Sequence, residues 1–129
     1  MYDVAKNLHE VLRDLPDGVK LVAISKFHPN EYIEVAYNEG QRIFGESQEQ
    51  ELSRKVDTLP KDIEWHFIGH LQTNKVKYIV PYISMIEAVD SLKLLKEINK
   101  QAANTLPRPF LSAKTALKAL GHALFASLP

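Results

Sequence analysis

Apolar residues recur at two different spacings along this chain, and the two spacings alternate. Over residues 3–15 they recur every three or four positions, which is the pattern of an amphipathic helix. Residues 20–25 then form a short apolar, partly β-branched run typical of a buried strand. A second helical stripe begins near Pro29 and stops at Gly40. The sequence therefore predicts a helix followed by a strand–helix unit.

The strand–helix unit then repeats three more times. We predict further strands at residues 42–45, 65–69 and 82–87, with helices at about 46–57, 73–80 and 90–103. Four such units favour a parallel sheet with right-handed crossovers. No glycine-rich phosphate loop follows any strand, which disfavours a nucleotide-binding Rossmann fold. We therefore expect an α/β fold corresponding to the N-terminal half of a (β/α)8 TIM-type barrel, because a whole barrel needs about 250 residues.

Composition narrows the class of protein and of partner. Sixteen Lys and Arg balance sixteen Asp and Glu, so no overall field attracts nucleic acid or an anionic membrane. The 129 residues include no cysteine, which excludes disulfides and thiolate metal sites. Residues 1–10 carry charges unlike a signal peptide, and no stretch approaches the roughly 20 apolar residues of a membrane span. We expect a cytoplasmic protein.

The charge is unevenly distributed, which divides the chain in two. All sixteen acidic residues precede residue 98. The basic residues after that point are Lys100, Arg108, Lys114 and Lys118. Residues 112–125 carry an Ala- and Leu-rich helical stripe that begins at Ser112, a residue type that commonly caps helices. We therefore predict a partial barrel domain over 1–103 and a non-homologous, helical tail over 104–129.

In βα barrels the functional groups gather at the carboxyl ends of the strands, which directs attention to Lys26. Lys26 ends a nearly uncharged strand, and an apolar surrounding would lower its pKa, as a Schiff-base lysine requires. The alternative is a lysine that marks where a strand reaches water, the commoner role of an isolated lysine.

Two histidines and a set of charged residues offer further candidates. His66 and His70 resemble a metal pair, but four strand residues span about 13 Å, so we predict no metal site. We interpret His66 as a core or inter-strand histidine, and His70 either as a polar lining residue beside Gly69 or as a solvent-facing loop residue. The residues that we expect on solvated helix faces are Glu46, Glu49, Gln50, Lys93, Lys96 and Lys100.

Four segments of the chain can be read together as a family signature. They are residues 21–26 (LVAISK), 40–46 (GQRIFGE), 64–75 (EWHFIGHLQTNK) and 89–92 (VDSL). In these segments the chain resembles the pyridoxal phosphate homeostasis protein family, the YggS-like proteins related to the barrel domain of alanine racemase. The resemblance covers about residues 1–103, and the segment from Glu64 to Lys75 is its most specific part.

The resemblance implies a barrel that holds pyridoxal phosphate as a Schiff base and acts in vitamin B6 homeostasis. The family has no established catalytic reaction, so we predict no enzyme and no catalytic residue. On this match Lys26 is the Schiff-base lysine and His70 lines the same face. Ser47 stands where the family commonly has asparagine, and its hydroxyl offers a shorter hydrogen-bonding group.

The resemblance covers only the first half of the barrel. Barrels of this type usually hold a phosphate with the loops after strands seven and eight. We therefore expect a truncated chain in which that half of the cofactor site is missing. The alternative is a cofactor-free half-barrel that associates as a homodimer through its two open sheet edges.

Overall fold

The computed structural model describes residues 3–87, 89, 91–104 and 123–127, the last of these as backbone only. The strands in this part of the chain form one parallel sheet in the order β4-β3-β2-β1-β5. They are β1 (Lys20–Ile24), β2 (Ile43–Glu46), β3 (Glu64–Phe67), β4 (Ile83–Ile86) and β5 (Ala123–Ser127). Sequential parallel neighbours from β1 to β4 confirm the four predicted strand–helix units.

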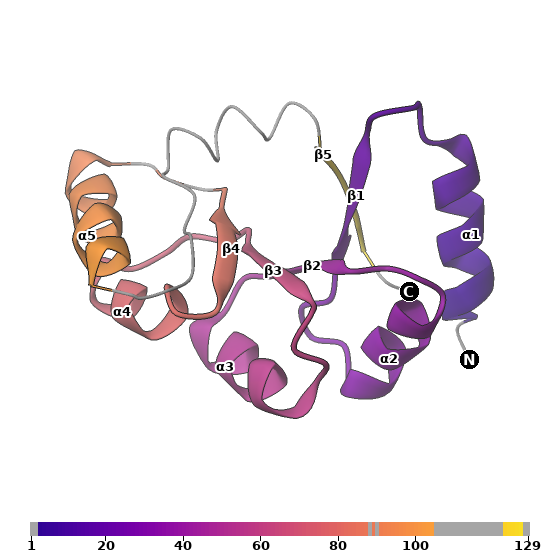
Figure 1. The fold of residues 1–129 in the computed structure, drawn as a ribbon, viewed down its shortest axis with the longest axis horizontal. Helices are drawn as coiled ribbons and strands as arrows, with labels where there is room; N and C mark the ends of the chain where they lie inside the picture. The colour runs from indigo at the N-terminus through magenta and orange to yellow at the C-terminus, as the bar shows by residue number, and fades with distance from the viewer. Residues whose placement is uncertain (1–2, 88, 90, 105–122, 128–129) are drawn as a thin grey trace.

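The helices form an outer arc around the strands (Figure 1). They are α1 (Val4–Asp14), α2 (Asn30–Asn38), α3 (Glu49–Thr58), the 3-10 turn η1 (Thr73–Lys75), α4 (Val76–Ile79) and α5 (Leu92–Ala103). Ser91 caps α5, because its hydroxyl accepts a hydrogen bond from the Leu94 N–H at 3.1 Å. Gly40 ends the α2 segment at φ +103°, a backbone conformation that favours glycine.

Alternate side chains of β1, β2 and β3 pack under the helices. Leu21 and Ala23 of β1, Phe44 of β2, and Trp65 and Phe67 of β3 are all buried in one apolar core. The helices close this core with side chains that are completely buried, namely Ile33, Leu52, Ile79 and Ile98. The core therefore lies between the sheet and the helical layer, as a half-barrel with helices outside requires.

Two predicted helix boundaries differ from the structure. The helix expected from residue 46 begins at Glu49, because Glu46 is the last residue of β2 and pairs with Phe67 of β3. The helix expected over 73–80 is divided into η1 and the short α4. Glu46 is consequently a strand residue and not a member of a solvated helix face.

The predicted tail helix is wrong where the structure describes it. Ala123–Ser127 is the strand β5, which pairs in parallel with all five residues of β1. The physical reason is that β1 would otherwise present a row of unpaired backbone N–H and C=O groups, and this pairing outweighs the local helical pattern. The expected open edge at β1 is therefore occupied, while residues 112–122 of the predicted helix lie outside the described residues.

In the described part of the chain, no helix is long and apolar enough to cross a bilayer.

Candidate functional site

The carboxyl ends of β1 to β4 lie along one edge of the sheet. Three backbone hydrogen bonds extend the pairing just past the strand ends: Ser25 N–H to the Gly45 carbonyl, Ile68 N–H to the Glu46 carbonyl, and Glu87 N–H to the Phe67 carbonyl, at 2.9–3.0 Å. We call the segments gathered there the rim, comprising residues 25–28, 46–48, 68–71 and 87. Every site residue that the sequence predicts lies in the rim.

Lys26 lies in the turn directly after β1, where its side chain is half-buried. Within the described residues its ammonium makes no ion pair. The position combines partial shelter from water with access to the rim. It is therefore suited to an amine that must reach a small molecule at this edge of the sheet.

Ser47 and the segment around His70 come together beside each other on the rim. A Cβ atom placed on Gly69 would lie 2.7 Å from the Ser47 Cβ and 3.0 Å from the Ser47 carbonyl oxygen. The loops after β2 and β3 thus touch at a point where only glycine fits. Ser47 is half-buried and His70, one residue beyond Gly69, is exposed. Their contact with a cofactor stays a prediction.

A buried lysine lies beneath the turn that carries Lys26, and sequence reasoning missed it. The Lys55 side chain is 0% exposed. Its ammonium donates three hydrogen bonds, each of 2.9 Å, to the Ser25 carbonyl, Glu46 Oε2 and Glu51 Oε2. An ammonium has three N–H donors, so every donor of Lys55 has an acceptor.

Glu46 completes this cluster from the end of β2. Its side chain is fully buried, which corrects the prediction that it faces solvent. The carboxylate accepts hydrogen bonds from the Ser25 hydroxyl and from Lys55, while its Oε1 is buried without a partner in the described part of the chain. We call Ser25, Glu46, Glu51 and Lys55 the Lys55 cluster. It joins the ends of β1 and β2 to helix α3.

The pKa values of the two carboxyl groups of the Lys55 cluster are shifted in opposite directions. Burial raises the pKa of Glu46 above its ordinary value, against the opposing effects of the Ser25 hydroxyl and Lys55. Burial also acts to raise the pKa of Glu51, but hydrogen bonds from Lys55 and the Phe27 N–H outweigh it and hold that pKa below its ordinary value. Glu51 is therefore the more readily ionised partner of Lys55.

His66 and Glu87 form a second buried polar pair on the rim side of β3 and β4. The His66 Nδ1 lies 2.7 Å from Glu87 Oε1, and both side chains are more than nine-tenths buried. This contact confirms the prediction that His66 is an inter-strand histidine. Among the described residues, no group of three or more histidine and carboxylate side chains could hold a metal ion.

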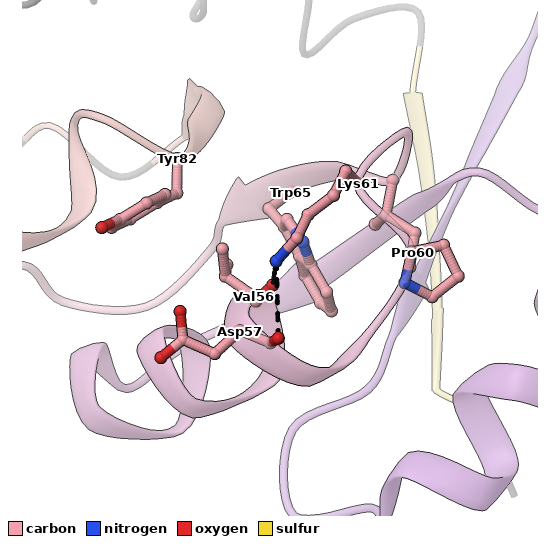
Figure 2. Close-up of a pocket in the computed structure, with 7 residues that line it drawn as sticks. Val56, Asp57, Pro60, Lys61, Trp65 and Tyr82 are labelled. Atoms are coloured by element: carbon pink, nitrogen blue, oxygen red, sulfur yellow. Dashed lines mark hydrogen bonds between the residues drawn. The ribbon is translucent and has the colours of Figure 1, made fainter.

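A hollow of about 310 Å³ lies at the opposite end of the sheet from the rim. Figure 2 shows Lys61 reaching back to the carbonyls of Val56 and Asp57 at the end of α3, with Trp65 behind them and Tyr82 to the left. The Lys61 ammonium donates to those carbonyls at 2.7 and 3.4 Å, so it caps the helix. Because barrel sites form at the carboxyl ends of strands, we place the candidate site at the rim.

Comparison with known proteins shows which proteins this chain resembles. No family model matches the chain. A protein of Schizosaccharomyces pombe named pyridoxal phosphate homeostasis protein is 49% identical over 84 residues, which are 64% of this chain and 35% of that protein. This chain is a relative of the pyridoxal phosphate homeostasis proteins. It spans between about a third and a half of the length of the curated relatives it matches.

Solved structures support the same relationship and the predicted fold class. PipY of Synechococcus elongatus, solved with PLP (pyridoxal phosphate) bound, is 37% identical with a TM-score of 0.73, over 79% of this chain and 49% of PipY. Alanine racemase of Enterococcus faecalis shares the fold with a TM-score of 0.61 at 16% identity, over 76% of this chain and 27% of the racemase. The described α/β arrangement thus corresponds to part of a larger fold in these two structures.

Proposed function

We propose that this chain binds pyridoxal phosphate covalently through the amine of Lys26. The relatives are named for pyridoxal phosphate homeostasis, and PipY was solved with this compound bound. The observation that carries the proposal here is the position of Lys26 on the rim, half-buried and directly after β1. The Ser47 hydroxyl and the imidazole of His70 occupy neighbouring loops of the same rim and are the proposed polar contacts.

The chemistry needs one neutral amine with access to an aldehyde. Pyridoxal phosphate supplies that aldehyde: a C–N bond forms with Lys26, the aldehyde oxygen leaves as water, and a Schiff base remains. Lys55, the other lysine near the rim, is unsuited to this step. It is fully buried, and all three of its N–H groups are bonded. The rim therefore offers one suitable amine in the described part of the chain.

We further propose that the bound compound is held and released, and not used to transform a substrate. A homeostasis protein needs a reversible bond to the cofactor, and Schiff-base formation is reversible in water. The relatives' names support this role over a metabolic reaction. Vitamin B6 balance is accordingly the proposed context for this chain.

Titration with pyridoxal phosphate tests the proposed function. Adding the compound to the whole chain should produce a saturable visible absorbance that is lost when Lys26→Ala removes the amine. Lys96→Ala, at an exposed position of α5, is the matched control and should retain it. A wild-type chain that develops no saturable absorbance, or equal absorbance in Lys26→Ala, would refute the proposal.

A second candidate function is association of two copies through a sheet edge. In the part of the sheet that the structure describes, β4 is hydrogen-bonded to β3 on one side only. Such an edge can pair with another strand, and a two-fold arrangement would satisfy it in both copies. We expect sedimentation over a range of concentrations to show a homodimer. A monomer at every concentration would remove this candidate.

A further inference from the structure

The turn that carries Lys26 is tied to helix α3 on both sides. Before Lys26, the carbonyl of Ser25 accepts a hydrogen bond from the Lys55 ammonium at 2.9 Å. After Lys26, the N–H of Phe27 donates to Glu51 Oε2 at 2.7 Å. Glu51 and Lys55 are themselves joined at 2.9 Å, one helical turn apart. The backbone on either side of Lys26 is therefore held by one ion pair.

The conformation of Phe27 shows that this turn needs a restraint. Its φ is +66°, in the left-handed region that bulky residues rarely adopt. The Phe27 side chain is 71% exposed, so burial of the ring does not hold the turn. Two hydrogen bonds hold this backbone: the His28 N–H donates to the Ser25 carbonyl at 3.1 Å, and the Phe27 N–H donates to Glu51 Oε2. Removing that acceptor should therefore let the turn relax.

The hydrogen bonds that Glu51 and Lys55 make to the Lys26 turn, which we call the tie, are effective because they lie away from water. The side chain of Lys55 is 0% exposed and that of Glu51 is 9% exposed. Charge-assisted hydrogen bonds are strong where solvent does not compete with them. Glu46 adds a second carboxylate contact to Lys55 from β2, so the ammonium is fixed against the sheet as well as within its own helix. Movement of the Lys26 turn would break this network.

We propose that Glu51 and Lys55 are positioning residues that fix the Lys26 turn for bond formation with pyridoxal phosphate. This inference rests on the proposed function of Lys26. An amine held in one place reacts with a bound aldehyde far more favourably than one that samples many positions. The Lys55 cluster itself touches no cofactor in this scheme and acts through the backbone of residues 25–27.

The test replaces Glu51 by two side chains of similar size. Glu51→Leu removes the Oε2 acceptor that Phe27 and Lys55 share, whereas Glu51→Gln keeps one oxygen that can accept from both. Two controls lie on the same helix. Glu49→Leu alters a carboxylate that bonds only Ser53 among the described residues, and Leu52→Ala weakens the core without removing either hydrogen bond from α3 to the turn. Each whole-chain variant is titrated with pyridoxal phosphate after circular dichroism shows that it is folded.

We expect Glu51→Leu to weaken Schiff-base formation by about tenfold or more. Glu51→Gln should restore most of the affinity, and the two controls should bind like the wild type. If Glu51→Leu does not fold, Glu51→Asp takes its place, because its shorter side chain cannot bring an oxygen to the position of Glu51 Oε2, which accepts from both Phe27 and Lys55. Equal affinity in the folded Glu51 variant and in Leu52→Ala would overturn the proposal, because the effect would then be one of stability alone.

Hydrogen exchange at the Phe27 amide measures whether Glu51 holds the turn, independently of whether pyridoxal phosphate binds. In the wild type without added cofactor, the Phe27 amide should exchange slowly, and Glu51→Leu should accelerate it while Glu49→Leu does not. If pyridoxal phosphate forms no bond with the wild type, the proposed function fails, and the exchange rate still reports whether the tie exists. Unchanged exchange at Phe27 in Glu51→Leu would overturn the tie itself.

Discussion

Replacing Lys55 by methionine is expected to lower the free energy of unfolding by about 3–5 kcal/mol. Methionine has a similar length but no N–H donors, so the Ser25 carbonyl loses a partner and two carboxylates lose their counter-charge. Glu46 and Glu51 would then remain almost entirely out of water without a cation beside them. Urea unfolding followed by circular dichroism measures the loss.

Lys96→Met is the matched control for this substitution. Lys96 is exposed on α5, so its replacement should change stability by no more than about 0.5 kcal/mol. The loss caused by Lys55→Met should also shrink as the pH falls, because protonation of the two unpaired carboxylates removes their buried charge. A Lys55→Met chain as stable as the control would show that the cluster does not stabilise the fold.

Replacing Gly69 by alanine is expected to destabilise the chain by about 1–3 kcal/mol through overpacking. The new Cβ would lie 2.7 Å from the Ser47 Cβ and 3.0 Å from the Ser47 carbonyl oxygen, so the backbone of one loop must move. That movement separates the loops after β2 and β3 on the rim. Thermal or urea unfolding reports the stability, and titration with pyridoxal phosphate reports the effect on the proposed site.

Gly45→Ala provides the comparison. The atoms nearest to its Cβ would be in the side chains of Ile68 and Val22, at 3.2–3.3 Å, and these can yield by a few tenths of an ångström. We therefore expect a smaller loss of stability than for Gly69→Ala. Equal losses in the two variants would argue against a special role for the Gly69–Ser47 contact.

Much of the fold could be predicted from the sequence because local pattern and tertiary structure agree there. The alternation of apolar strands with amphipathic helices identified β1 to β4 and their helices. The predicted carboxyl ends of the strands then placed Lys26, Ser47 and His70 together on the rim. In a parallel sheet this follows directly from strand direction.

The Lys55 cluster could not be predicted, because its sequence pattern is shared with exposed helices. Glu51 and Lys55 are four residues apart, the spacing of common surface ion pairs, and polar residues surround them. Only the packing of α3 against the ends of β1 and β2 buries them. Glu46 was misplaced for a related reason: a glutamate at the strand–helix boundary gives no local sign that it belongs to the strand.

In the tail, the local sequence pattern favours a helix, whereas the tertiary structure favours a strand. Ala123, Leu124 and Phe125 continue a helical stripe in the sequence, yet they pair with β1 as part of β5. Helix propensity contributes a few tenths of a kcal/mol per residue, whereas an unpaired buried strand edge leaves several backbone groups without partners. The sheet edge therefore determines the structure of these residues.

The central claim is that Lys26 forms the bond to pyridoxal phosphate, and chemical trapping tests it most directly. Borohydride reduction of the wild-type chain with the compound converts the Schiff base to a stable amine, and peptide mass spectrometry then identifies the modified lysine. We predict one dominant modification, on Lys26, at substoichiometric compound. Modification spread evenly over the exposed lysines, or dominant at another lysine, would contradict the account.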